Sequence, residues 1–322
     1  MGLSRHPRIE ALFSQTKLLG FGRYVLTVPV DSRLSFGYDI PTLPNQAENL
    51  KKIVEAKVAE IKAHHKTAEI NYVGPGPAPH VTWIRSYSTI YAKELGLEGF
   101  DIYYVLSPHI FNPGDAVSSG ERSYEQVLAH TLHVARALRL RQPDELPLEE
   151  GLCHEYAFQR LAGAEGSISS AGLHIAALPD VVFSVFSNTG GSVDGENGYG
   201  LIQRMENQKK KLGADYPKCT LLRAAKRKIH DWEGEETLFR NEDGSHDFRW
   251  LAIGIRNSVA RPAKLDVTLY DKVRYDMIGG ADKASLSDEE ALALWDKLLE
   301  SLKFRVAVPG APDSAVQFKG VL

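Results

Sequence analysis

Short runs in which apolar and polar residues alternate dominate the second half of this 322-residue chain. In the run Lys264–Asp271, the apolar residues Leu265, Val267 and Leu269 occupy every second position. A period of two is typical of a β-strand that has one buried face and one wet face, and such strands usually pair antiparallel. Five further strand candidates cover residues 173–178, 181–188, 221–229, 235–240 and 248–255. Pro179 and Asp180, between the first two of these, predict a hairpin turn. The second half is therefore expected to build an antiparallel sheet.

The first half combines strands with helices. Residues 24–28 and 34–40 alternate in the same way, and the turn at 29–32 predicts that they form a pair. Apolar residues at helical spacing predict helices over 46–65 and 121–141. Strand candidates lie at 81–87 and 100–106, and a further helix is expected at 201–212. The mixture predicts an α+β fold.

The segment 285–305 carries the clearest helix signal. Ser287 and Glu290 form a capping-box pattern, and Leu286 precedes it at the hydrophobic-staple position. The expected buried stripe consists of Ala291, Leu294, Trp295, Leu298, Leu299 and Leu302. Such a wide apolar stripe predicts a helix that packs into a core.

Two prolines interrupt the chain near its middle, at Pro143 and Pro147. Because proline ends helices and favours connections, the segment 142–147 is expected to link two domains. A chain of this length fits two domains, at about 100–200 residues each. We expect domains at 1–145 and 146–322, each a mainly antiparallel sheet packed with two or more helices.

Composition excludes several classes of protein. The net charge of −3 gives no global attraction to DNA, RNA or anionic lipid. No apolar run reaches the roughly 20 residues that span a bilayer, so no transmembrane segment is expected. The first seven residues do not resemble a secretory signal, which leaves two readings: a cytoplasmic protein, or a mature form without its leader.

Motifs of catalysis and cofactor binding are missing from the sequence. It contains no GxSxG nucleophile elbow, no phosphate-binding loop and no HExxH motif. A nucleophile and a base are adjacent at Cys153 and His154, followed by Glu155, but neighbours in a strand point to opposite faces. We therefore expect no enzyme activity, no cofactor and no metal. An unrecognised hydrolase around His154 and Glu155 is the less favoured alternative.

The two cysteines, Cys153 and Cys219, leave two possibilities open. They could be separate thiols, since free cysteine is often buried. They could also form one disulfide in an oxidising compartment, closing a loop of about 66 residues.

The glycine-rich segment 189–200 is a candidate contact loop, because loops presented by a rigid scaffold often carry recognition. It contains Asp194, Glu196 and Tyr199. A plain flexible connection is the alternative.

Several short blocks occur in a recognisable order and spacing. They are Gly22–Pro29, Gly151–Cys153, Phe183–Thr189, Gly234–Arg240, Phe248–Trp250 and the capped helix within Ser285–Arg305. In this order the chain resembles the immunity proteins that neutralise lipase effectors of the type VI secretion system. The resemblance extends from Gly22 almost to Arg305, and is strongest in the second half.

The resemblance implies a periplasmic protein with two α+β domains that binds and inhibits a co-encoded phospholipase or lipase effector. Inhibition is expected through clamping of the effector, which would block opening of its lid or its access to membrane. It implies no catalysis, and it assigns no contact residues. Family members usually carry an export or lipid-attachment signal, and the first residues here show none. The alternative is a periplasmic binding or scaffold protein for another partner.

Overall fold

The computed structural model describes residues 3–112, 123–161, 166–191, 200–273 and 278–319. The chain divides into two compact units. The large unit comprises Met1–Tyr38, Asp144–Glu155 and Leu161–Leu322, and the small unit comprises Asp39–Pro143 and Tyr156–Arg160. The expected α+β class is confirmed, because both units combine helices with antiparallel sheets.

The units differ from the linear division at residues 145 and 146. The chain does pass from one unit to the other at Pro143, but its first 38 residues belong to the large unit. The reason is packing: Phe21 and Leu26 are almost fully buried in the same core as the C-terminal helix. A periodicity pattern identifies strands but not the sheet that each strand joins.

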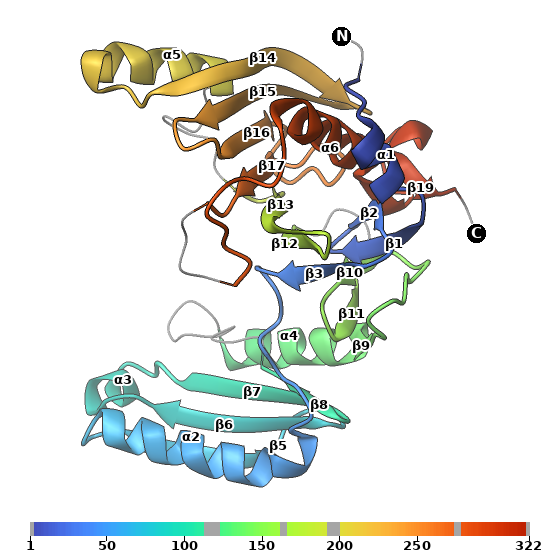
Figure 1. Ribbon diagram of the computed structural model, residues 1–322. Coiled ribbons are helices and arrows are strands. Elements are labelled where there is room, and N and C mark those ends of the chain that lie inside the picture. Colours follow the sequence, from blue (N-terminus) through green and yellow to red (C-terminus); the bar gives the residue numbers. More distant parts are fainter. Residues whose placement is uncertain (1–2, 113–122, 162–165, 192–199, 274–277, 320–322) are drawn as a thin grey trace. The chain divides into compact units, whose positions relative to one another are not determined.

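The small unit is built on one antiparallel sheet in the order β4-β8-β7-β6-β5 (Figure 1). Its strands are β4 (Thr42–Leu43), β5 (Glu69–Pro75), β6 (Val81–Tyr87), β7 (Gly99–Leu106) and β8 (His109–Phe111). Its helices are α2 (Leu50–His64), α3 (Ile90–Glu94) and α4 (Tyr124–Ala137), with a 3-10 turn at Ala47–Asn49. A separate antiparallel pair joins β9 (Leu138–Leu140) to β11 (Ala157–Arg160).

Helices cover both faces of this sheet. Val54 of α2 packs in one buried cluster with Ile84 and Tyr103. Val127 of α4 packs in another cluster, which contains Trp83. Since neighbouring residues of a strand point to opposite faces, Trp83 packs on the side of α4 and Ile84 on the side of α2.

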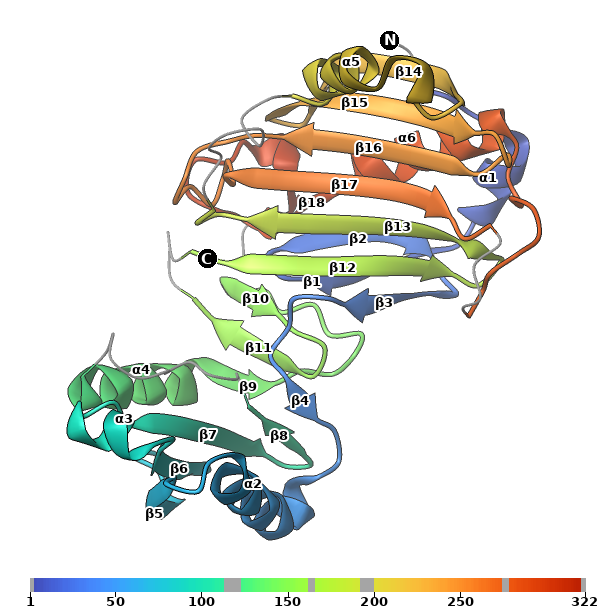
Figure 2. The same cartoon turned by 90° about the vertical axis from the view of Figure 1, so that its left-hand side faces the viewer.

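The large unit contains a seven-stranded sheet in the order β14-β15-β16-β17-β13-β12-β3, seen face-on in Figure 2. All of its pairings are antiparallel. The strands are β3 (Ser32–Phe36), β12 (Ile168–Ile175), β13 (Leu178–Asn188), β14 (Cys219–Ile229), β15 (Trp232–Asn241), β16 (His246–Ala252) and β17 (Lys264–Asp271).

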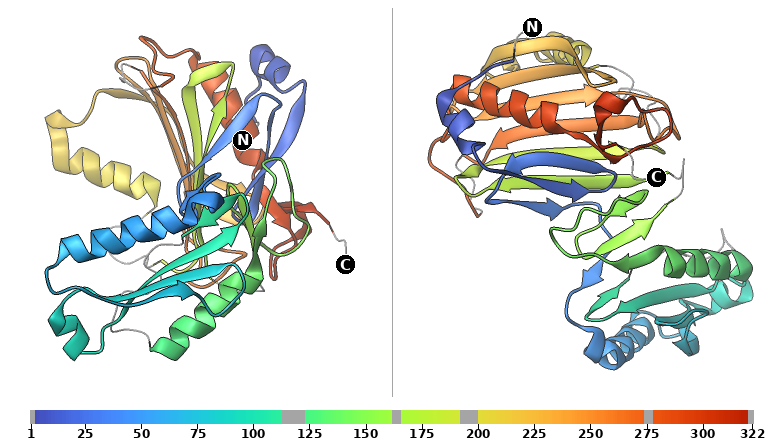
Figure 3. Two further views of the ribbon diagram at one scale, coloured as in Figure 1. Left: turned by 90° about the horizontal axis from the view of Figure 1, so that it is seen from below. Right: turned by 90° about the vertical axis from the view of Figure 1, so that its right-hand side faces the viewer.

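A helix and a second sheet cover one face of the seven-stranded sheet (right view of Figure 3). The helix is α6 (Asp288–Ser301), and the second sheet has the order β1-β2-β18-β19. Its strands are β1 (Thr16–Phe21), β2 (Tyr24–Pro29), β18 (Lys303–Val306) and β19 (Val316–Phe318). The remaining elements are α1 (Pro7–Leu12), β10 (Gly151–Cys153), α5 (Leu201–Leu212) and 3-10 turns at Gly213–Asp215 and Asp313–Ala315.

The capped helix forms as the sequence predicts. Ser287 accepts from the backbone N–H of Glu290, and the Glu290 carboxylate accepts from the backbone N–H of Ser287. These bonds satisfy two backbone donors that a helix start otherwise leaves unpaired. All six residues of the predicted stripe are fully buried. Trp295 contacts the rings of Phe183 and Phe248, so α6 is anchored on the middle of the seven-stranded sheet.

One predicted pairing and one predicted turn position are wrong. The strand at 24–29 does not pair with the next one: β2 forms a hairpin with β1, whereas β3 pairs with β12. Gly22 makes that hairpin possible, because it has a φ of +48° and a Cβ there would lie 2.4 Å from Ser169 Oγ. The turn between β12 and β13 lies at residues 176–177, since Ile175 is opposite Leu178.

Within the described ranges, the helices are too short or too polar to span a bilayer.

Candidate partner-binding surface

The two faces of the seven-stranded sheet have opposite chemistry. On β17, Leu265, Val267 and Leu269 are completely buried against α6 and the second sheet. Thr268 and Tyr270 point to the other face, where they remain accessible. This polar face is a surface that a partner can reach, whereas the apolar face is occupied by the core.

The polar face is hollowed along its β3, β12, β13 and β17 strands, with a volume of about 790 Å³. We call this feature the outer hollow. Its lining combines serine, aromatic and charged side chains with the aliphatic ones of Ala171, Val182, Val185 and Ile278. The lining residues used below are Ser35, His174, Phe186, Asp266, Thr268, Tyr270 and Lys272.

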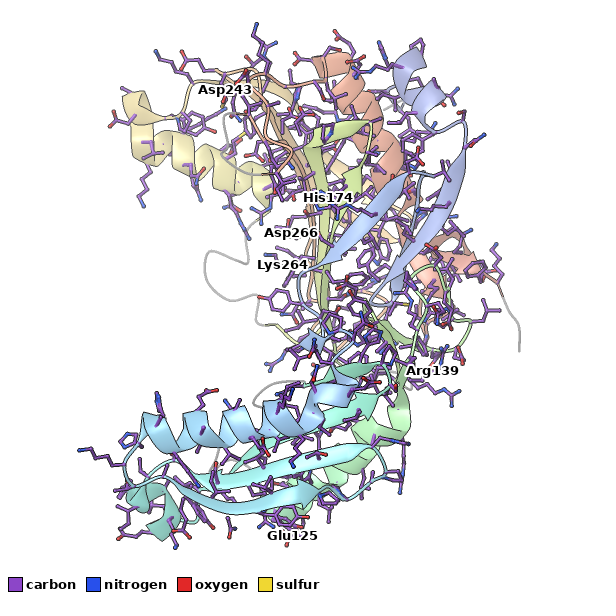
Figure 4. The ribbon with its side chains drawn as sticks, turned by 60° about the horizontal axis from the view of Figure 1, so that its bottom comes forward. Glu125, Arg139, His174, Asp243, Lys264 and Asp266 are labelled. Atoms are coloured by element: carbon purple, nitrogen blue, oxygen red, sulfur yellow. The ribbon has the colours of Figure 1, made fainter. Side chains whose placement is uncertain are left out.

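A network of charges lies on the β17 side of the outer hollow. Arg249 forms two hydrogen bonds with Asp266, of 2.8 and 2.6 Å, in a fork that fits a carboxylate. Lys264 Nζ lies 3.0 Å from the same carboxylate and 5.3 Å from the centre of the Phe186 ring. Asp266 is therefore matched by two cations. In Figure 4, Lys264, Asp266 and His174 project from the face that lies away from α6.

The end of the outer hollow at which His174 lies has unbalanced positive charge. His174 Nε2 lies 3.1 Å from Ser35 Oγ, and Arg33 is opposite His174 in the strand register. Burial, followed by the positive charges of Arg33 and Lys272, lowers the pKa of His174. Arg33 and Lys272 give this end of the outer hollow a positive potential.

Aromatic rings border the polar groups. Phe186 meets Tyr38 edge-on, with 5.6 Å between ring centres, and Tyr38 is 59% exposed. Tyr270 is also accessible on the β17 side. Aromatic side chains are enriched in protein–protein interfaces relative to the rest of the surface.

A second charged group, on the edge strand β14, has a structural role. Arg223 and Arg227 point from β14 to Asp296 of α6, at 2.5 and 2.6 Å. Glu236 of β15 lies between them and accepts from Trp295 Nε1 at 3.1 Å. Because these carboxylates are almost fully buried and hold both arginines, the group fastens the sheet edge to α6.

His246 is buried between two carboxylates, at the start of β16. Its Nδ1 lies 2.6 Å from Asp271 Oδ2, and its Nε2 lies 3.1 Å from Asp288 Oδ1. Burial by itself would lower the pKa of His246, but the hydrogen bonds and charges of Asp271 and Asp288 outweigh it and raise the pKa. The ring thereby links the sheet to the first turn of α6.

The structure does not join Cys153 and Cys219. Cys153 bridges to Gly22, whose backbone lies against Ser169 of β12, whereas Cys219 begins the edge strand β14. Five strand spacings of about 4.8 Å separate β12 from β14, or roughly 24 Å. A disulfide requires Cα atoms within about 7 Å, so of the two possibilities the structure adopts separate thiols.

The other residues considered from sequence do not converge on a site. His154 and Glu155 directly follow β10, and nothing in their placement tests the hydrolase alternative. Most of the candidate contact loop, including Asp194, Glu196 and Tyr199, lies outside the described residues. No group of three potential metal ligands occurs in the described ranges.

Sequence reasoning missed the outer hollow, although part of its signal was visible. The polar positions of the alternating run 264–271 include Asp266, Thr268 and Tyr270, which line it. Their partners His174 and Ser35 come from strands that the pattern could not place beside β17.

The chain is similar to known proteins both in sequence and in fold. Residues 145–307, about half of the 322, match the family described as Tle cognate immunity protein 4 C-terminal domain. No curated protein matches the chain closely enough to count as a relative.

Solved immunity proteins share the fold. The immunity protein TplEi of the type VI secretion system from Pseudomonas aeruginosa, complexed with "L" peptide, has a TM-score of 0.70 and 22% identity. That match covers 91% of this chain and 99% of TplEi. A chain of the Tle4-Tli4 complex has a TM-score of 0.70 and 23% identity, with coverage of 90% and 97%. The extent of the sequence match places the chain in the family: it belongs to the Tle cognate immunity protein 4 family.

Proposed function

We propose that this protein is an immunity protein that binds and inhibits a cognate phospholipase or lipase effector of the type VI secretion system. The observation that carries the proposal is the family match over residues 145–307. The fold supports it, because a similar chain occurs in the Tle4-Tli4 complex and another is complexed with a peptide.

Inhibition requires a large and specific contact. We propose that the protein works in the periplasm and has no catalytic activity of its own. It binds the effector through both units and blocks opening of the lipase lid or approach to the membrane. A complex that protects the cell is expected to bury about 2,000 Å² or more. The outer hollow is one part of the large unit that can contribute to this contact.

Mixing the purified protein with the effector encoded beside its gene tests the proposal. We expect co-elution in size-exclusion chromatography and loss of lipase activity on phospholipid micelles at equimolar ratio. An unrelated lipase is the control and is expected to keep its activity. Separate elution together with full lipase activity would refute the proposal.

The absence of catalysis needs its own measurement. The protein alone is expected to leave phospholipid and ester substrates unchanged. Turnover that disappears in a His154→Ala variant would instead favour a hydrolase.

A further inference from the structure

We propose that the outer hollow binds an acidic, extended segment of the effector, with a carboxylate of that segment held between Arg33, His174 and Lys272. This inference rests on the proposed function and adds the chemistry of one contact. It is carried by three observations: the dimensions of the hollow, its charge and its aromatic border.

The dimensions fit a short stretch of polypeptide. The hollow crosses four neighbouring strands, β3, β12, β13 and β17. Three strand spacings of about 4.8 Å give a width of about 14 Å. At about 3.3 Å per residue, an extended segment of roughly four residues crosses it.

The charge selects a negative occupant. Among the described residues that line the hollow, Asp266 is the single carboxylate, and Arg249 and Lys264 already match it. Within the described ranges, no carboxylate lies within 4.0 Å of the cationic groups of Arg33 or Lys272. The carboxylate of Asp247 does not line the hollow, because Asp247 belongs to β16, the strand beyond β17.

The cationic groups have donors to offer. Arg33 is exposed, and its guanidinium carries five N–H donors. Lys272 Nζ donates to the carbonyl of Ile278 at 2.6 Å, which uses one of its three N–H bonds. A carboxylate between these groups would also favour protonation of His174, since an anion stabilises the imidazolium. Arg33, His174 and Lys272 then each have an N–H group to donate to the anion.

The aromatic border suits the rest of the segment. Phe186, Tyr38 and Tyr270 present ring surface beside the charged groups. Rings of this kind contribute contact area at low cost in conformational entropy, and they are enriched in protein interfaces. A phosphate headgroup of a lipid would engage the cations but would not use this border, so the observations favour a peptide segment.

Two variants test the proposal in different ways. Arg33→Glu reverses the unbalanced charge on the exposed edge of the hollow. Thr268→Trp fills the middle of the hollow without changing charge. Lys17→Glu makes the same charge change on β1 of the second sheet and is the matched control. Far-UV circular dichroism and thermal unfolding verify that each variant is folded.

The readout is the dissociation constant for the purified effector, measured by calorimetry in 50 and 300 mM salt. We expect Arg33→Glu and Thr268→Trp to weaken binding at least 10-fold, and Lys17→Glu by less than 2-fold. Salt is expected to weaken binding of the unaltered protein more than binding of Arg33→Glu, because the variant lacks the attraction that ions screen.

The outcomes separate the two proposals. If the unaltered protein binds the effector and both variants bind equally tightly, the outer hollow does not contact an acidic segment, while the proposed function stands. If Arg33→Glu loses binding to phosphatidylglycerol vesicles but keeps binding to the effector, the occupant is a lipid headgroup and the proposal is wrong. If the unaltered protein does not bind the effector, the proposed function fails and this inference fails with it.

Discussion

Asp296 is the centre of the buried charge group that joins β14 to α6, and its replacement tests that role. The residue is 1% exposed. Its carboxylate lies 2.5 Å from Arg223 Nη2 and 2.6 Å from Arg227 Nη1, and it accepts from the backbone N–H of Ser4 at 2.8 Å. Asp296→Asn keeps the shape of the side chain but removes its charge, which leaves two guanidinium groups insufficiently matched.

The expected loss follows from the desolvation of these arginines. Removing one partner of a buried ion pair costs about 3–5 kcal/mol. Glu236 remains beside both arginines, so we expect the lower end, about 3 kcal/mol. With a urea slope of about 3 kcal/mol/M, the unfolding midpoint of the large unit falls by about 1 M.

Tryptophan fluorescence provides the assay once the tryptophan of the small unit has been replaced. Trp83 lies in the small unit, whereas Trp232, Trp250 and Trp295 lie in the large unit. Replacing Trp83 by Phe loses no hydrogen bond to the described residues, since its indole N–H has no partner among them. In this background, urea titration follows the large unit alone.

The control is Asp31→Asn, a change of the same chemistry at an exposed turn. It is expected to shift the free energy of unfolding by less than about 0.5 kcal/mol. A midpoint shift below about 0.2 M for Asp296→Asn would refute the reasoning, because the arginines would then not depend on Asp296. The pH provides a second check. Burial opposes ionisation of Asp296, but the arginine partners outweigh it and lower its pKa. The pair therefore stabilises the fold above the carboxylate's unfolded pKa, and the stability is lost as pH falls through the folded pKa.

Three further predictions concern the same unit. The raised pKa of His246 means that the ring's contribution to stability is full below its unfolded-state pKa and is lost as pH rises through its folded-state pKa. Urea midpoints of His246→Gln should not show this loss of stability with rising pH. A pH profile equal to that of the unaltered protein would count against this role of His246. Ser287→Ala removes the helix cap and should cost about 1 kcal/mol by urea titration, whereas a neutral result would show that the cap adds nothing. Unfolded, unreduced protein should take up two alkyl groups by mass spectrometry, at Cys153 and Cys219, and uptake of none would show a disulfide.

Local sequence determined the elements that have a clear periodic pattern of apolar residues or a helix-capping motif. β6 and α5 have the predicted bounds of 81–87 and 201–212, and β17 matches 264–271. Helix α6 begins directly after its predicted cap. These elements depend on contacts between residues a few positions apart, so a short stretch of sequence is enough to predict them.

Strand pairing and unit membership depended on contacts between distant residues. The hairpin turn at 176–177 was misplaced because Pro179 and Asp180 look like a turn, yet both lie inside β13. Asp180 is held there by two hydrogen bonds to Ser285, which is 105 residues away. A local pattern cannot contain that information.

The sequence by itself determined the α+β class, the capped core helix and the family, because periodicity, capping and block order can be read from the order of the residues alone. Only the tertiary structure decided that the first strands join the C-terminal core and that Cys153 and Cys219 lie far apart. It also brought Arg33, His174 and Lys272 together at one end of the outer hollow. The physical reason is that a strand's neighbours are chosen by burial of its apolar face over the whole unit, and that choice then fixes which polar side chains meet on the opposite face.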